Sequence, residues 1–203
     1  MMEVLSPDSP QMAIASDLFK RYPFATLLVS KKRDVMPEIV HLPFLYDHAN
    51  QCFYAHAAAK NPIVSLIQAG QNQAKLIFNG EHGYVSPAWT EHQRVPTWDY
   101  CVVHVAGLLT LVEQADDKVQ SMVAQVAAME GSGANDWQIS ALNDKLQTQM
   151  LKAIKVIKIS INSMSYRYKM SQDKHPDGQS AIRAKFAEKG EQAMVARYQA
   201  LHE

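Results

Sequence analysis

The chain has 203 residues, 47% of them hydrophobic and 20% charged, and its 20 Lys and Arg residues balance its 20 Asp and Glu residues. This length suits one sizeable core with peripheral helices, so we expect a single domain over residues 1–203. The zero net charge excludes a strong whole-chain field toward nucleic acid, and the lack of a long uncharged apolar run or signal-peptide pattern predicts a cytoplasmic protein that does not enter a membrane.

A helix is predicted to open the chain, because Ser9-Pro10 is a cap residue followed by proline and apolar residues then recur at helical spacing. After Pro23 the pattern becomes β-branched and apolar, which is typical of strands. The predicted extended runs cover residues 24–30, 35–46 and 51–56.

The middle of the chain alternates between helix and strand signals. Asn61-Pro62 repeats the cap-then-proline signature and predicts a short helix through Gln68 that ends near Gly70. A strand is predicted over 74–78. The run over 96–113 predicts one long strand or two strands joined at a glycine bend at Gly107.

In the second half, Asp116 and Asp117 mark a helix N-terminus. The apolar stripe of this helix stops at the glycines that follow it, and its members are Val119, Met122, Val123, Val126 and Met129. A further helix is predicted over 140–152 and a strand with one wet face over 153–162. One or two amphipathic helices around Gly190 are predicted over 178–201 as a C-terminal helical extension, which begins at about residue 176.

Several strands, few crossover helices and helices gathered at the ends predict an α+β fold with a mainly antiparallel sheet, more like a small barrel than a doubly wound sheet. Neither a Gly-x-Gly-x-x-Gly motif nor a Gly-Lys-Ser/Thr loop occurs, which argues against Rossmann and P-loop nucleotide binding. Cys52 and Cys101 lie in apolar runs and are too few for a disulfide framework, so we expect buried thiols in a reducing compartment.

The segment over 78–113 is unusually rich in aromatic and polar rings. Trp89, Trp98, Tyr84 and Tyr100 offer flat apolar faces together with polar edges, which neither an aliphatic core nor a solvated loop needs. Such a lining favours a planar heterocycle with polar substituents as ligand.

Five segments in this order resemble the PaiB-type FMN-binding negative transcriptional regulators over about residues 18–185. The segments are His41-Leu-Pro-Phe44, His56-Ala-Ala-Ala-Lys-Asn-Pro62, His82-Gly-Tyr-Val-Ser-Pro-Ala-Trp89, Val95-Pro-Thr-Trp-Asp-Tyr100 with His104, and Lys169-Met-Ser-Gln172. The resemblance implies an FMN-binding split β-barrel, shared with pyridoxamine-phosphate oxidases and flavin reductases, that works as a homodimer with FMN near the subunit interface. The chain departs from the family at Ala59, where the family has arginine, and Lys60 stands next to it.

An FMN site needs an anion clamp for the phosphate, a flat wall for the ring and hydrogen-bonding partners for the pyrimidine edge. Among the resembling segments, four residues are candidates for the clamp, two indoles for the walls, and Ser86, Thr97 and His104 for the edge. The complete set of predicted FMN-binding residues is His41, His56, Lys60, Asn61, Ser86, Trp89, Thr97, Trp98, Tyr100, His104, Lys169, Ser171 and Gln172, in which Lys60, Lys169, Ser171 and Gln172 form the clamp and Trp89 and Trp98 the walls.

Each role has a structural alternative. Trp98 in an extended run fits a core position equally well, and Trp89 after Ser-Pro fits a packed turn. Lysines such as Lys60 and Lys169 are most often solvated. The histidines lack metal-ligand spacing, so we predict no metal site. Haem ligation by one histidine stays an alternative, because related split barrels include haem-handling proteins.

Two classes of function follow. In the first, the protein is a transcriptional regulator or flavin-dependent sensor, with DNA as a partner through eleven basic against five acidic residues from Lys145 onward. In the second, it is an FMN-dependent oxidoreductase, a flavin reductase or an oxidase. A third alternative is a vestigial pocket that binds flavin weakly. Hydrolase chemistry is not expected, since no Gly-x-Ser-x-Gly elbow occurs.

Overall fold

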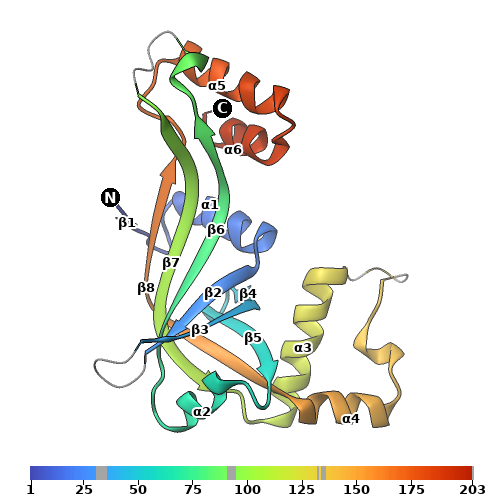
Figure 1. Cartoon of the computed structure of the whole chain (residues 1–203). Coiled ribbons are helices and arrows are strands. Elements are labelled where there is room, and N and C mark those ends of the chain that lie inside the picture. The colour runs from blue at the N-terminus through green and yellow to red at the C-terminus, as the bar shows by residue number, and fades with distance from the viewer. Residues whose placement is uncertain (31–35, 91–94, 132, 134–135, 203) are drawn as a thin grey trace. The chain divides into compact units, whose positions relative to one another are not determined.

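The computed structural model describes residues 1–30, 36–90, 95–131, 133 and 136–202 (Figure 1). The strands are β1 (Glu3–Val4), β2 (Phe24–Val29), β3 (Glu38–Pro43), β4 (Leu45–Asp47), β5 (Cys52–Ala58), β6 (Gln73–Val85), β7 (Thr97–Leu111) and β8 (Ile154–Lys169). The α-helices are α1 (Gln11–Arg21), α2 (Pro62–Gln68), α3 (Ala115–Glu130), α4 (Asp144–Ala153), α5 (Pro176–Glu188) and α6 (Gln192–His202). Short 3₁₀ turns, η1 (Pro87–Trp89) and η2 (Ile139–Ala141), complete the described elements.

Within the described residues, the strands form one sheet in the order β3-β2-β6-β7-β8-β5-β4, with β1 paired to β8. The pairs β2–β3, β2–β6, β4–β5 and β5–β8 are antiparallel. This arrangement confirms the predicted α+β class with a mainly antiparallel sheet.

The chain forms two compact units. Unit 1 comprises Met1–Glu3, Asn79–Val103 and Tyr166–Glu203, and unit 2 comprises Val4–Phe78 and His104–Ser165. The long strands β6, β7 and β8 therefore contribute residues to both units. The single-domain organisation expected from length stays a prediction.

The core of unit 2 is an aromatic cluster on the inner face of the sheet. The ring centroid of Phe19 from α1 lies 4.7 Å from that of Phe78 and 4.9 Å from that of Phe53. Alternate residues of β2, with Leu27 at 0% exposure, point to the same side. Strand periodicity thus separates a buried inner face from an outer face in this unit.

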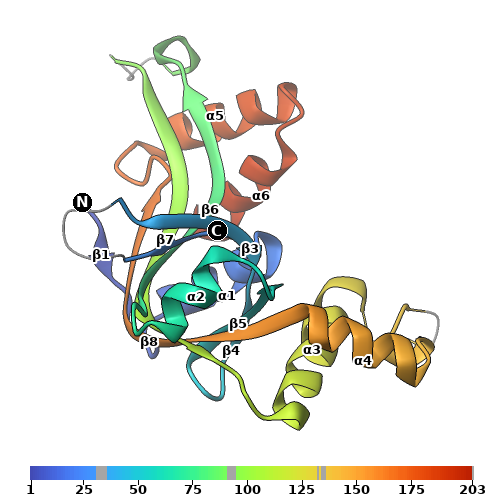
Figure 2. The ribbon, with the colours of Figure 1, turned by 60° about the horizontal axis from the view of Figure 1, so that its bottom comes forward.

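In the same unit, α3 and α4 lie side by side in two views (Figures 1 and 2) and line a small apolar cavity through Met122, Met150 and Leu151. The stripe predicted for α3 is only partly buried: Met122 is 6% exposed, whereas Val123 and Met129 are 49% and 51% exposed. Helix α4 has no buried residue. The helical pattern thus predicted both helices, but it did not indicate how little of them is buried.

In unit 1, helices α5 and α6 cover the inner side of the β6–β7 hairpin. Gly83 permits this packing, because a Cβ atom there would lie 2.6 Å from the ring of Phe186. Two buried carboxylates of the hairpin meet adjacent residues of α6: Arg197 binds Glu81 through Nε at 2.9 Å, and the Tyr198 hydroxyl donates to Asp99.

Several predicted local signals are confirmed. The Asn61 side chain caps α2 by accepting from the N–H of Ile63 at 3.1 Å, with proline at the first turn. Helix α3 has Asp116 and Asp117 in its first turn and ends at Gly131, whose φ is 103°. Both cysteines are buried.

Other boundaries differ from the prediction. Ser9 does not cap α1: its Oγ donates to the carbonyl of Ser6 at 2.8 Å, and Pro10 holds the N-cap position without a side-chain bond. Strands β6 and β8 run seven residues beyond the predicted ends at 78 and 162, to Val85 and Lys169. Glycines in β6 and serines in β8 hide the alternation that would have extended both strands. Val35, placed in a predicted run, lies outside the described residues.

Candidate functional site

The outer face of the sheet in unit 2 is the first candidate surface. Pairing between β2, β3 and β6 sets its side chains in cross-strand rows, because residues directly opposite in an antiparallel pair share a face. Leu28 lies opposite Ile39 and Lys75, and Thr26 lies opposite His41 and Ile77. We define the outer face by these two rows together with Phe24, the first residue of β2, and His104 on β7, the strand next to β6.

This outer face mixes exposed apolar groups with polar groups that make no hydrogen bond to the residues that the structure describes. Phe24 is 66% and Ile39 49% exposed, and the Phe24 ring stacks on His41 with centroids 6.0 Å apart and planes 25° apart. Within the described part of the chain, the side chains of His41, Lys75 and His104 make no hydrogen bond or ion pair. Exposed apolar surface of this kind marks an interaction or ligand site.

The electrostatics of the outer face centre on His104 and Lys75. Partial burial lowers the pKa of His104, and the nearby ammonium of Lys75 lowers it further. Both causes disfavour the imidazolium. His104 is therefore neutral at physiological pH, with one ring nitrogen as a donor and the other as an acceptor.

A pH titration tests this assignment. We expect NMR of the unliganded protein to give His104 a pKa below 6.5, its ordinary value. Because the pKa is lower in the folded state than in the unfolded state, unfolding binds a proton in the window between the two values. The His104 contribution to stability therefore falls as pH drops through this window, and is lost below the folded pKa. A measured pKa at or above 6.5 would contradict the assignment.

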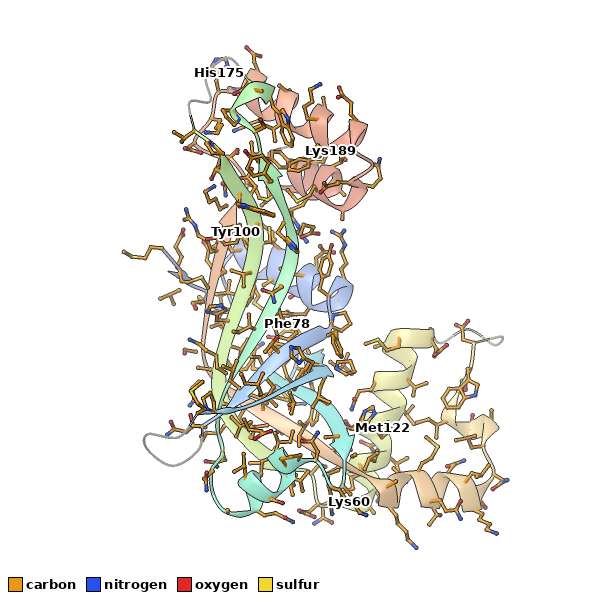
Figure 3. The ribbon with its side chains drawn as sticks, in the orientation of Figure 1. Lys60, Phe78, Tyr100, Met122, His175 and Lys189 are labelled. Carbon is orange, nitrogen blue, oxygen red and sulfur yellow. The ribbon has the colours of Figure 1, made fainter. Side chains whose placement is uncertain are left out.

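The other predicted residues of unit 2 lie at β5 and the start of α2. His56 Nδ1 is 3.0 Å from Gln125 Oε1 of α3, and both residues border a cavity of about 120 Å³. Asn61 caps α2, as described above. The Lys60 side chain is exposed (Figure 3), and no contact engages its ammonium within the described residues.

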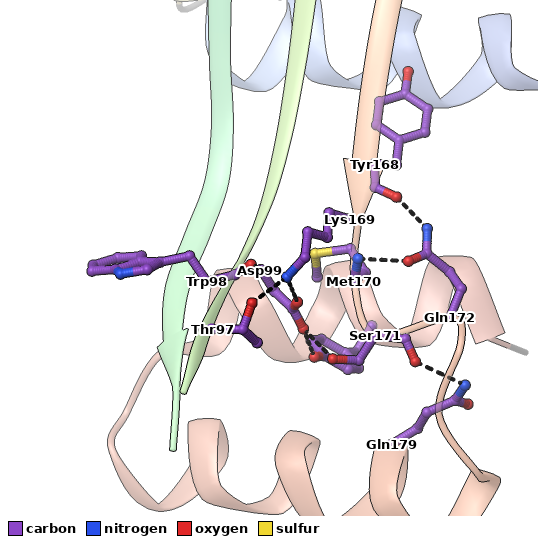
Figure 4. A network of polar contacts seen from close by, with 10 residues as sticks. Thr97, Trp98, Asp99, Tyr168, Lys169, Met170, Ser171, Gln172 and Gln179 are labelled. Carbon is purple, nitrogen blue, oxygen red and sulfur yellow. Dashed lines mark hydrogen bonds and ion pairs between the residues drawn. The ribbon is translucent and has the colours of Figure 1, made fainter. Parts of the chain in front are cut away.

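In unit 1, three of the predicted residues meet in a polar network around the buried carboxylate of Asp99 (Figure 4). Lys169 Nζ donates to Thr97 Oγ1 and to the carbonyl oxygen of Trp98, both at 2.5 Å, and lies 3.4 Å from Asp99 Oδ1. The Ser171 hydroxyl donates to Asp99 Oδ2 at 2.7 Å. The network thus joins β7 to the end of β8.

Asp99 is fully buried, so its carboxylate needs these donors. Burial also raises the pKa of Tyr198, which keeps the phenol protonated as a further donor to Asp99. Gln172 bonds backbone groups of Met170 and Tyr168. A second anion next to Asp99 would be repelled, and the ammonium of Lys169 is already engaged. The phosphate-clamp roles of Lys169, Ser171 and Gln172 stay predictions.

The two predicted wall tryptophans of unit 1 differ in environment. Trp98 is 55% exposed, which excludes the alternative that it is a core residue. It lies on the outward side of the hairpin with His82 at 6.4 Å and Tyr84 at 6.1 Å between ring centroids. Tyr100, two residues along the same strand, is half-buried.

Trp89 is part of a packed turn. Its ring lies edge-on to Phe186 at 5.4 Å, and Lys189 Nζ sits 4.7 Å from its centroid. The Ser86 hydroxyl accepts from the N–H of Ala88 at 3.2 Å and thereby caps the turn. One face of this indole is therefore already in contact with a cation.

Other parts of the structure bear on ligands other than FMN. A cleft of about 770 Å³ in unit 2, between β4, β5 and α3, is lined by Tyr46, Tyr54, Asp117 and Lys158 among others and contains none of the predicted site residues. Among the residues that the structure describes, no group of three or more His, Cys, Asp or Glu is arranged to hold a metal ion. No helix in these residues is long and apolar enough to cross a bilayer.

Lys75, Thr26 and Phe24 were not among the predicted site residues. None belongs to a motif, and each becomes conspicuous only when the strand register sets it beside His41 or His104. The alternating pattern in 24–29 predicts that Phe24, Thr26 and Leu28 share one side of a strand, which is the signal that could have drawn attention to them.

Residues 8–163 match the family model described as "Putative FMN-binding domain". The chain is 28% identical over 141 residues to protease synthase and sporulation protein PAI 2 of Bacillus subtilis. The aligned region covers 68% of this chain and 67% of that protein.

Solved structures share the fold at low sequence identity. The flavocytochrome Anf3 of Azotobacter vinelandii has a TM-score of 0.63 at 13% identity, over 85% of this chain and 73% of that one. The FAD and heme binding protein of Mycobacterium smegmatis has a TM-score of 0.61 at 16% identity, over 85% and 78%. These similarities confirm the α+β split barrel, and by its family match the chain belongs to the PaiB-type FMN-binding proteins, with FMN as its cofactor.

Proposed function

We propose that the protein is a homodimeric flavin-dependent sensor that holds FMN against the outer face of unit 2. One observation carries the proposal: within the part of the chain that the structure describes, the side chains of His41, Lys75 and His104 make no hydrogen bond, and they lie on a surface that also exposes Phe24 and Ile39. A flat apolar surface with a few convergent polar groups suits a planar heterocycle with a polar edge.

The residues of the outer face fit this cofactor chemically. Neutral His104 offers a donor and an acceptor to a pyrimidine edge, and the rows around Leu28 and Thr26 offer a flat floor. The exposed ammonium of Lys60, in the same unit, is the phosphate candidate that no protein contact engages within the described residues. Bound FMN supplies the redox chemistry, and these residues bind and orient it.

The openness of this surface supports the proposed homodimer. Binding sites for small molecules bury about 70–90% of the ligand. A sheet face that leaves Phe24 66% exposed covers only one side of a ring system. A second copy of the chain would cover the other side and bury the exposed apolar residues. Sedimentation showing a monomer at micromolar concentration in the presence of FMN would remove this part of the proposal.

Direct DNA contact gains little support from the basic residues after Lys145. At least six of the eleven basic side chains in this part of the chain contact protein partners within the described residues: Lys158 with Tyr54, Arg167 with Glu3, Lys169 with Asp99, Lys185 with Glu188, Lys189 with Trp89, and Arg197 with Glu81. Four of these partners are carboxylates, which offset part of the positive charge within the protein. We favour a sensor whose effect on transcription, if it has one, passes through another molecule.

The experiment is a spectrum followed by three additions. Freshly purified protein should be yellow, or should quench FMN fluorescence on titration. A sensor should stay oxidised when reduced nicotinamide is added and should not shift promoter fragments at physiological salt. Bleaching by reduced nicotinamide would instead favour an FMN-dependent oxidoreductase, and a shifted fragment would favour direct DNA binding. Protein that ignores FMN would overturn both the flavin-dependent sensor and the oxidoreductase.

Replacing Trp98 by alanine tests the aromatic wall predicted in unit 1. If the indole contacts FMN, the Kd should rise about five-fold or more, since an aromatic contact contributes ~1 kcal/mol. Stability should change little, because the side chain is 55% exposed. Trp137→Ala is the matched control: Trp137 is 43% exposed and lies outside the predicted site. Equal FMN affinities in the two variants would exclude the wall role.

A further inference from the structure

Lys75 occupies a distinctive place on the outer face. It lies at the end of the row Ile39–Leu28–Lys75 across three strands, with aliphatic side chains as its neighbours in register. The residue next to it in β6, Leu76, is fully buried on the opposite side of the sheet. The strand register therefore fixes the direction of Lys75 toward the surface that we propose for the flavin.

The charge of Lys75 has no evident structural purpose. Surface lysines commonly pair with carboxylates, but within the described residues no acidic side chain contacts this ammonium, and its titratable neighbour on β7 is the imidazole of His104. A cation beside His104 disfavours protonation of the ring, so the pair carries a single positive charge at physiological pH. A single uncompensated cation on a partly apolar surface suits a ligand that gains negative charge.

Reduction gives FMN this property. A hydride donor transfers two electrons and one proton together and is itself oxidised, whereas dithionite gives two electrons as it is oxidised to sulfite and water supplies the proton. Either reaction converts the neutral oxidised ring into an anionic reduced ring. An ammonium next to the ring lowers the free energy of the reduced form more than that of the oxidised form. We propose that Lys75 sets the reduction potential of the bound flavin by placing its ammonium beside the ring. This inference rests on the FMN site proposed above.

The alternative position for this ammonium is the phosphate of FMN. Phosphate binding usually takes several donors that converge on three oxygens. Lys75 lies near the start of β6, beside Leu28 and neutral His104, and neither forms such a clamp with it. A flat ring fits these neighbours better than a phosphate, which is why we assign Lys75 to the ring.

The test compares Lys75→Met and Lys75→Arg with the unaltered protein, and Lys145→Met on exposed α4 serves as the control for loss of one positive charge. Midpoint potentials are measured by dithionite titration against indicator dyes, and Kd values for oxidised FMN, reduced FMN and riboflavin by fluorescence or calorimetry. For Lys75→Met we expect a lower midpoint potential, with the Kd of reduced FMN rising about three- to ten-fold more than that of oxidised FMN. Lys75→Arg and Lys145→Met should keep the original potential.

The outcomes separate the two proposals. Tight FMN binding with an unchanged potential in Lys75→Met would overturn the role of Lys75 alone. So would a weaker affinity for FMN with an unchanged affinity for riboflavin, because this would place the ammonium at the phosphate. If the unaltered protein binds no FMN, the proposed function fails and this inference fails with it. A rise of the His104 pKa in unliganded Lys75→Met would independently support the proximity of the two side chains.

Discussion

Replacing Arg197 by methionine should lower the free energy of unfolding by about 3–5 kcal/mol, because the change leaves a buried carboxylate without its partner. Arg197 binds Glu81 through two nitrogens, at 2.9 and 3.1 Å, and the two side chains are 2% and 0% exposed. The ion pair links α6 to β6 inside unit 1. Urea denaturation followed by circular dichroism, with the midpoint and slope fitted together, measures the effect.

Two further variants test whether the unpaired buried carboxylate causes the loss of stability. The double variant Arg197→Met with Glu81→Leu should recover much of the loss, since replacing both members of a buried pair by apolar groups is often close to neutral. Lys185→Met breaks the exposed pair with Glu188, whose side chains are 42% and 62% exposed, and should change stability by no more than about 1 kcal/mol. A loss below about 1 kcal/mol in Arg197→Met would mean that the buried pair is not the main anchor of α6.

Replacing Phe78 by alanine should cost about 3–5 kcal/mol, through lost burial and the cavity left in the core of unit 2. The ring is fully buried, and its centroid lies 4.7 Å from that of Phe19, 5.2 Å from Phe53 and 6.5 Å from Phe44. Thermal and urea unfolding of the variant provide the measurement.

Phe24→Ala is the matched control for this variant. Phe24 is 66% exposed and lies on the outer face, so its removal should leave the unfolding midpoint nearly unchanged. If FMN binds at this face, the same variant should instead have a lower affinity for FMN. Equal losses of stability in the two phenylalanine variants would contradict the division of the sheet into a buried inner face and an outer face.

The parts of the fold that depend on short-range chemistry were predictable from sequence. The cap of α2 needs only Asn61 and the proline after it, and the end of α3 needs only a glycine that accepts a positive φ at Gly131. The lengths of β6 and β8 were not predictable, because their later residues include glycine and serine positions whose burial is decided by packing against α5 and α6 or by pairing along the sheet.

The candidate site was predictable only in part. Motifs pointed to His41 and His104. The strand register places His41 on the outer face of unit 2, and the electrostatic interaction with Lys75 places His104 beside the same face. The same motifs predict that Lys169 binds a phosphate, and they did not reveal that its ammonium contacts Asp99. A motif fixes residue types but not their neighbours. A carboxylate from a distant strand can therefore engage a lysine in a way that no local pattern reveals. Lys75 was missed because it belongs to no motif, and only the folded chain brings it close to His104.

Arg197 and Tyr198 are consecutive residues of α6, yet they reach different strands, Glu81 on β6 and Asp99 on β7. A single turn of α6 thus binds both strands of the hairpin. Cutting the chain after Gly190 would uncover two carboxylates at once, and the ionised groups would draw water between the strands. The carboxyl-terminal helix is consequently a poor place for truncation, and an affinity tag is better joined at the amino end.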